Sequence, residues 1–356
     1  MKQKRLFVKA GLLAVILVSA TLISWEIHLR NQGRGISYDD SGSLWSEKRK
    51  QVYEAIDKAT VFIGSSRIKY DLDIPTWQNI TGDHAIQLAN VGSSPRPVLD
   101  NLAEDQHFKG KLVIDVTEFL FFAQAPFVDK TPKENIDYYK KETPAQKFSF
   151  AVNHVLESNL FFLDKEEYSL NALLAGTKIP NRTDVYEFPD FPAGFTPVTF
   201  DRQSYMTDRF VNDSNSVNQV TRVWAMFGKM SEKMPPVTNA AIDGIIASVK
   251  TACDKIRARG GQVIFVRTPS SGPLLAMERM AFPREKFWNK LLAATGCQGI
   301  HFEDYPPIAK FECPEFSHLS VPQAVSFTKT FISILKDKGW RFPSHNNLTA
   351  STNSKI

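Results

Sequence analysis

Cysteine is scarce in this 356-residue chain, which contains only Cys253, Cys297 and Cys313. Three cysteines exclude a disulfide-dense secreted scaffold, and their spacing does not match a zinc site. Cys297 and Cys313 enclose a 15-residue segment, so a disulfide between them would brace that loop. Three buried free thiols are an equally good interpretation, because cysteine is commonly a small core residue. The sequence leaves both alternatives open.

An excess of one charge is also missing from most of the chain. Lys and Arg outnumber Asp and Glu by only five, 43 to 38, and Lys2, Lys4, Arg5 and Lys9 supply four of the extra cations. The remainder has no basic stripe with interleaved aromatic residues, which argues against nucleic-acid binding. His84, His107, His154 and His301 have no companions at ligand spacing, and no cofactor motif is present. We therefore expect neither a metal nor a cofactor.

One long hydrophobic run lies near the N-terminus. Ala10 to Trp25 is a stretch of 16 residues without a charge, and adding Leu6 to Val8 brings it close to the length that spans a bilayer. The cations before it should stay in the cytoplasm, so the rest of the chain should lie outside. We predict a cytoplasmic tip and transmembrane signal anchor over 1–30. A cleaved signal peptide is the alternative, but Thr21-Leu22-Ile23 is a poor cleavage site.

The remaining length suits one large α/β domain with an insertion. We expect an insertion over 124–236, because aromatic residues there alternate with Pro, Asn and charged residues and no strand-helix rhythm survives. We expect it to be partly helical over 146–173, to cap the active-site edge and to use its aromatic residues as local core. The other predicted parts are a polar linker over 31–46, an α/β domain over 47–123 and 237–340, and a disordered tail over 341–356.

Short apolar runs alternate with helical patterns in the α/β part. Strands alternating with helices imply a parallel, right-handed, doubly wound sheet. The fold class predicted from this rhythm is α/β, with a five-stranded sheet. The predicted strands cover 61–63, 85–89, 111–116, 262–266 and 299–302. The predicted helices cover 46–59, 98–107, 239–259, 283–295 and 321–338.

Two short motifs point to chemistry. Gly64-Ser65-Ser66 follows the first predicted strand, and so stands at the carboxyl edge of the sheet, where open α/β folds bind ligands. Glu315 precedes His318 by three positions, just before the last predicted helix. A serine nucleophile needs a base and a group that orients the base. We predict Ser66, His318 and Glu315 for these roles. In the alternative, His318 caps the helix and Glu315 faces solvent.

Taken together, these motifs resemble the SGNH (GDSL-like) hydrolase superfamily over about residues 55–120 and 240–335. In that family a Gly-Asp-Ser turn carries the nucleophile, and an Asp-x-x-His supplies the orienting acid and the base. Asn90-Val91-Gly92 is similar to a third family segment, whose glycine N–H lines the oxyanion hole. The resemblance implies a three-layer, flavodoxin-like fold and an oxyanion hole formed by the backbone of Ser66 and Gly92.

The chain departs from the family pattern after the third strand. Val116-Thr117-Glu118-Phe119 stands where the family has Gly-x-Asn-Asp, whose Asn is a further oxyanion donor. Loss of such a donor can cost about 3 kcal/mol of transition-state stabilisation. Either Thr117 or another group substitutes for it, or turnover in water is slow.

Two arginines should lie on the catalytic edge. Arg67 follows the predicted nucleophile, and Arg267 ends the fourth strand shortly before Ser270. We predict Arg67, Arg267 and Ser270 as binding residues for an anionic or hydroxyl-rich substrate. A structural salt bridge is an equal alternative, and Glu118 is a candidate partner.

The resemblance implies a serine acyl-ester enzyme without a cofactor. Membrane attachment and the altered Asn segment make the chain similar to family members that work in cell-surface polysaccharide O-acylation beside a membrane-bound O-acyltransferase. We therefore expect an O-acetyl esterase or O-acyltransferase in the bacterial inner membrane. Its main domain should lie in the periplasm or another extracytoplasmic space and act on carbohydrate. The alternative is a non-catalytic accessory protein of the same fold that binds glycan or docks the acyltransferase.

Overall fold

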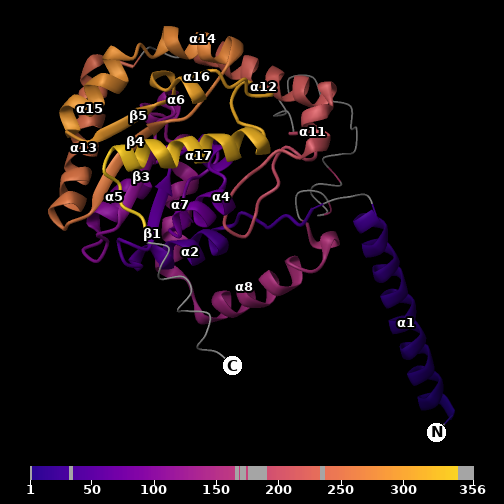
Figure 1. The fold of residues 1–356 in the computed structure, drawn as a ribbon. Helices are drawn as coiled ribbons and strands as arrows, with labels where there is room; N and C mark the ends of the chain where they lie inside the picture. The colour runs from indigo at the N-terminus through magenta and orange to yellow at the C-terminus, as the bar shows by residue number, and fades with distance from the viewer. Residues whose placement is uncertain are drawn as a thin grey trace. The chain divides into compact units, whose positions relative to one another are not determined.

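The computed structural model describes residues 2–31, 35–164, 168, 174, 191–232 and 237–343 (Figure 1). The chain divides into two compact units, one formed by Met1–Asp39 and Pro144–Glu187 and the other by Asp40–Thr143 and Phe188–Ile356. The range predicted as a single insertion, 124–236, is therefore shared between both units. Of the predicted tail, 344–356 lies outside the described residues.

A parallel five-stranded sheet forms the centre of the larger unit. Its strand order is β2-β1-β3-β4-β5, and every neighbouring pair is parallel. The strands are buried along most of their length, which explains their apolar, β-branched runs. The predicted α/β class and five-stranded parallel sheet are confirmed. The strands are β1 Ala59–Ile63, β2 His84–Gln87, β3 Lys111–Asp115, β4 Gln262–Arg267 and β5 Gln298–His301.

The strand order reverses at β1. Val61 pairs with Ile86 of β2 on one side and with Leu112 of β3 on the other. In doubly wound sheets, ligands bind outside the carboxyl ends of the strands at such a reversal. The turn after β1 therefore lies at the position that this fold favours for a site.

Hydrophobic cores cover both faces of the sheet. Val61 and Ile63 belong to one core and Phe62 to the other, as the alternation of side chains along a strand requires. The first core contains residues of α2 Gly42–Lys50, α5 Arg96–Glu104, α7 Phe127–Lys141, α13 Asn239–Ala258 and α15 Lys290–Thr295. The second contains residues of α3 Ser66–Asp71, α4 Ile74–Thr81, α16 Pro306–Ala309 and α17 Val321–Asp337.

Shorter elements complete the larger unit. Three of them follow the carboxyl ends of strands: α6 Glu118–Phe121, α14 Gly272–Ala281 and the single turn η4 Phe302–Asp304. Two more come from the range predicted as insertion: α11 Asp208–Asn212 and α12 Ser214–Glu232.

The predicted boundaries of the linker and of two helices differ from the structure. The predicted linker, 31–46, contains the start of α2 at Gly42, and the predicted helix 46–59 ends at Lys50 and continues only as the single turn η1 Gln51–Tyr53. The chain leaves the helix there because it must turn before entering β1 at Ala59. The predicted helix 283–295 begins instead as a π-helical turn, η3 Glu285–Asn289, ahead of α15.

The three cysteines are free and buried. Cys253 and Cys297 belong to the core on one face of the sheet, whereas Cys313 belongs to the core on the other face. A Cys297–Cys313 disulfide is therefore not formed, and the alternative of three buried thiols is confirmed.

The smaller unit contains α1 Lys2–Asn31, α8 Pro144–Glu157 and the turn η2 Phe161–Leu163. Within α1, Gln3–Asn31 has a mean hydropathy of 2.4 in its most apolar window, and no residue of that window is buried. The predicted N-terminal helix is therefore present, and it is long and apolar enough to cross a membrane.

Candidate active site

The turn between β1 and α3 requires glycine at position 64. A Cβ atom on Gly64 would lie 2.5 Å from Cβ of Asp115 and 2.6 Å from Cγ2 of Ile68. Ser65 is the N-cap of α3, and its hydroxyl oxygen accepts the backbone N–H of Arg67 at 3.3 Å. Ser66 is consequently the first residue of α3, directly beyond the carboxyl end of β1.

The Glu315–His318 loop is fixed on both sides. The N–H of Leu319 donates to Asp71 Oδ1 at 2.9 Å, and the carbonyl of Phe316 accepts the N–H of Ser271 at 2.9 Å. Phe316 has a left-handed backbone with φ of 76°, which is uncommon for a non-glycine residue. Ser320 is the N-cap of α17 and forms a capping box at the start of this helix, so the loop is held in place up to the helix.

The structure brings Ser66, His318 and Glu315 together. The Ser66 hydroxyl lies 2.9 Å from Nε2 of His318, and Nδ1 of His318 lies 2.9 Å from Oε1 of Glu315. The same carboxylate oxygen accepts the His318 backbone N–H at 2.6 Å. Because a carboxylate only accepts, Nδ1 carries the proton and Nε2 is left to accept the serine O–H. Glu315 and His318 are buried, whereas Ser66 is partly exposed.

Aromatic side chains enclose the histidine. The ring centroid of Tyr70 lies 4.3 Å from that of His318, and those of Phe195 and Trp224 lie 5.9 and 6.0 Å away. The Tyr70 hydroxyl donates to the carbonyl of Phe195 at 2.8 Å. Burial and the nearby Glu315 raise the pKa of Tyr70 well above its ordinary value, so this ring remains neutral at physiological pH.

Trp224 also completes the hydrogen bonding of Glu315. Its indole N–H donates to Oε2, the carboxylate oxygen that His318 does not use. Trp224 lies on α12, within the range predicted as insertion. Sequence reasoning missed it, because nothing in the spacing distinguishes this tryptophan from the other aromatic residues of that range.

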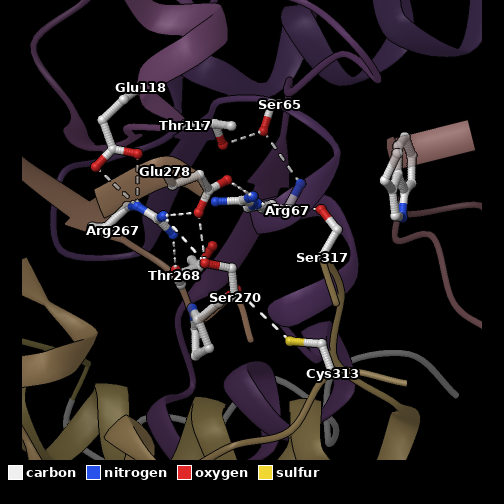
Figure 2. A network of polar contacts seen from close by, with 12 residues as sticks. Ser65, Arg67, Thr117, Glu118, Arg267, Thr268, Ser270, Glu278, Cys313 and Ser317 are labelled. Carbon is white, nitrogen blue, oxygen red and sulfur yellow. Dashed lines mark hydrogen bonds and ion pairs between the residues drawn. The ribbon is translucent and has the colours of Figure 1, made fainter. Parts of the chain in front are cut away.

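The three residues predicted to bind substrate lie in a buried ionic network instead (Figure 2). Arg267 Nε donates to both oxygens of Glu118 at 3.0 and 2.8 Å, and Arg267 Nη2 donates to Glu278 at 2.5 Å. Arg67 donates to the other Glu278 oxygen, and Ser270 donates to Glu278 at 2.7 Å. This arrangement matches the salt-bridge alternative, with Glu118 as the partner of Arg267.

Glu278 is the centre of this network, and sequence reasoning missed it. Burial alone would raise the pKa of Glu278, but the charges of Arg67 and Arg267 outweigh that effect and lower it to about 2. Two arginines and two glutamates balance in charge, so the network needs no external ion. Within the described part of the chain, Arg67 Nη1 is buried without a hydrogen-bond partner.

The hydroxyl of Thr117 is engaged in a second buried cluster. It lies 2.6 Å from the Ser65 hydroxyl, and both hydroxyl groups lie 3.1 Å from Asp115 Oδ2. Thr117 therefore uses its one O–H within this cluster. This geometry argues against Thr117 as the substitute for the family's oxyanion asparagine.

Gly92 lies in the turn that follows β2. It has a positive φ of 62° and is exposed. The turn is tied to the segment that carries Ser66, because the N–H of Asn90 donates to the carbonyl of Gly64 at 3.1 Å. The predicted oxyanion segment thus adjoins the β1–α3 turn.

Arg202 is buried and contacts the end of β2, just before this turn. Arg202 donates to the Gln87 carbonyl at 2.9 Å and to Asp40 at 2.7 Å, and Lys69 also donates to Asp40. The two cations outweigh the effect of burial and lower the pKa of Asp40 to about 2. Burial, only partly offset by Asp40, lowers the pKa of Lys69 to about 8. The sequence carries no signal for this cluster, since its members are far apart along the chain.

No group of His, Cys, Asp and Glu among the described residues is arranged to hold a metal ion. Comparison of the sequence with known protein families and with characterised proteins gives no match. The fold and the site together define an α/β protein whose parallel sheet carries a Ser-His-Glu constellation at the carboxyl end of β1.

Proposed function

We propose that this protein is a membrane-anchored serine acyl-ester enzyme that acts on cell-envelope polysaccharide, as an O-acetyl esterase or an O-acyltransferase. The observation that carries the proposal is the chain of contacts from the Ser66 hydroxyl through His318 to Glu315, with both nitrogen–oxygen distances at 2.9 Å. A hydroxyl, an imidazole and a carboxylate in this order form the arrangement that activates serine for acyl transfer.

The proposed reaction has two steps. In the first, His318 Nε2 takes the proton of Ser66 while the serine oxygen bonds to the ester carbonyl carbon, and the backbone N–H groups of Ser66 and Gly92 stabilise the oxyanion. The C–O bond to the leaving alcohol then breaks, and His318 returns the proton to that alcohol. In the second step, His318 deprotonates an acceptor hydroxyl, whose oxygen bonds to the acyl carbon. The bond from that carbon to Ser66 Oγ then breaks, and His318 returns the proton to the serine oxygen.

The acceptor is water or a sugar hydroxyl. Engagement of Thr117 with Ser65 and Asp115 supports slow hydrolysis, because this hydroxyl does not replace the missing oxyanion donor. A slowly hydrolysed acyl-enzyme would favour transfer to carbohydrate. Two rates distinguish an esterase from a transferase: hydrolysis of 4-nitrophenyl acetate, and acetylation of an added envelope oligosaccharide.

The anchor in this proposal is α1. The basic residues at its start favour a cytoplasmic N-terminus, which would place the larger unit on the periplasmic or other extracytoplasmic side of the bacterial inner membrane. A membrane-bound O-acyltransferase is the proposed partner, since it would supply acyl groups on the same membrane.

Labelling with a fluorophosphonate probe tests the nucleophile. The full-length chain in detergent should react, and Ser66→Ala should not. Ser65→Ala is the matched control, because it removes the neighbouring hydroxyl but leaves Ser66 in place. Labelling of Ser66→Ala equal to that of the wild type would refute the assignment.

A non-catalytic accessory protein of the same fold is the second candidate. It is favoured by the engagement of Thr117, which leaves the site without the third oxyanion donor. This alternative predicts binding of envelope oligosaccharide by a protein that no fluorophosphonate labels. Labelling that depends on Ser66 would eliminate it.

A further inference from the structure

An apolar stripe runs along α8 in the smaller unit. The stripe consists of four residues at helical spacing, which are 73%, 42%, 59% and 42% exposed: Phe148, Val152, Val155 and Leu156. None of the residues of α8 is buried. A helix with a continuous apolar face and a polar opposite face is suited to a water–apolar boundary.

The face of α8 opposite the stripe packs against another segment of the same unit. The ring of His154 lies 5.8 Å from that of Tyr38 and is stacked on Phe150 at 6.2 Å. Contacts inside the unit are therefore made by the face that points away from the stripe.

The chain just after α8 is attached to the end of α1. The Glu26 carboxylate accepts the backbone N–H groups of Phe161 and Phe162 at 3.2 and 3.4 Å, and Arg30 donates to the carbonyl of Asn159 at 2.6 Å. The Arg30 guanidinium also lies 4.9 Å from the centre of the Phe161 ring. Leu29 is buried at this joint. This joint between the end of α1 and the segment after α8 therefore combines apolar, ionic and backbone contacts.

The joint lies where α1 would leave a bilayer. The 30 residues of α1 span about 45 Å at 1.5 Å each, which exceeds the hydrocarbon thickness of roughly 30 Å. The apolar part ends at Trp25, so Glu26 and Arg30 would stand at the membrane surface. Trp25 packs edge-on against Tyr168 at 6.3 Å, and Trp and Tyr are enriched at this depth.

We propose that α8 is a second membrane contact, which lies on the extracytoplasmic surface with its apolar stripe in the boundary between lipid headgroups and acyl chains. The proposal rests on α1 as the anchor and does not depend on the chemistry of Ser66. The occupant of the stripe is lipid, because the joint with α1 holds α8 at the level where that boundary lies.

Environment-sensitive labels on the full-length chain in phosphatidylcholine nanodiscs test this. The reporter NBD is attached to Val152→Cys or Val155→Cys on the stripe, and to Asn153→Cys, an exposed polar position outside the stripe, as the matched control. The native cysteines are buried and leave little background. Each sample is quenched once with aqueous iodide and once with lipids that carry a nitroxide on the acyl chain.

NBD at positions 152 and 155 should lose emission with the nitroxide lipids and resist iodide, and NBD at position 153 should show the reverse. Iodide quenching at 152 equal to that at 153 would place the stripe in water and overturn the proposal. Protection from both quenchers would mean that protein covers the stripe, and would overturn it as well. Val15→Cys within α1 serves as the positive control, and its failure to respond to nitroxide lipids would instead refute the anchor. Fluorophosphonate labelling at Ser66 is read separately and tests the proposed enzyme.

Discussion

Trp224→Phe tests whether the helix α12 takes part in the proposed acyl transfer. The substitution keeps an aromatic ring beside His318 but removes the indole N–H that donates to Oε2 of Glu315. Glu315 has no exposed surface, so water does not readily replace the lost donor. The carboxylate would then be held by His318 alone and would lose part of its fixed orientation.

The expected loss of rate follows from the negative charge of the Glu315 carboxylate, which accepts the hydrogen bond. A hydrogen bond to a charged group contributes about 1.5–3 kcal/mol, which corresponds to a rate loss of roughly 10- to 100-fold if the bond is needed at the transition state. Trp224→Phe should therefore lower the rate constant for acylation of Ser66 by that factor. Because the indole N–H bonds to Glu315 rather than to substrate, KM should stay the same.

Trp77→Phe is the matched control. Trp77 also donates its indole N–H to a buried carboxylate, Asp83 Oδ1 at 3.3 Å, but Asp83 precedes β2 at the amino end of the sheet. This variant should lose stability and keep the wild-type acylation rate, measured as the rate of fluorophosphonate inactivation. Wild-type reactivity of Trp224→Phe, or an equal loss in both variants, would refute the role of Trp224.

Three further predictions concern the buried groups around the site. Glu278→Gln removes the negative charge that Arg67 and Arg267 share, and should lower the free energy of unfolding by about 3 kcal/mol. Urea denaturation followed by tryptophan fluorescence measures this change, and an unchanged midpoint would contradict the prediction. Glu278 has a pKa of about 2 in the folded protein, against an ordinary pKa of 4.5. The stability that its charge contributes is therefore complete above pH 4.5 and is lost as the pH falls toward 2. Wild-type stability should therefore drop over that range, and more steeply than that of Glu278→Gln; parallel pH curves would argue against the ion pairs. Gly64→Ala places a methyl group 2.5 Å from Cβ of Asp115 and should destabilise the protein by about 1–3 kcal/mol, whereas a fully stable variant would show that the turn can shift.

The sheet and the Ser-His-Glu residues were predictable from the sequence for local reasons. Strands buried on both faces must be apolar throughout, so β1, β3 and β4 are visible as short β-branched runs. Gly64 is required because the side chains of Asp115 and Ile68 leave no room for a Cβ atom, and His318 shortly precedes a helix with a capping box. The apolar runs, the Gly-Ser-Ser turn and the capping signal are each visible within a few neighbouring residues.

The partners of these residues were not predictable, because they come from segments whose placement no local pattern encodes. Trp224 reaches Glu315 from α12, and Glu278 reaches Arg67 from α14, at separations of 91 and 211 residues. An arginine at a sheet edge has the same sequence signature whether it binds substrate or a buried glutamate. Only the three-dimensional arrangement distinguishes the two, and here it favours the buried glutamate.

The most direct test of the account is detection of an acyl group on Ser66. The full-length protein is incubated with 4-nitrophenyl acetate, quenched with acid, digested and analysed by mass spectrometry. We predict one acetyl group on the peptide that contains Ser66, longer-lived when a sugar acceptor is absent, and none on that peptide in Ser66→Ala. Release of 4-nitrophenol at the same rate by wild type and Ser66→Ala, with no acetylated peptide, would contradict the proposal that this serine is the nucleophile.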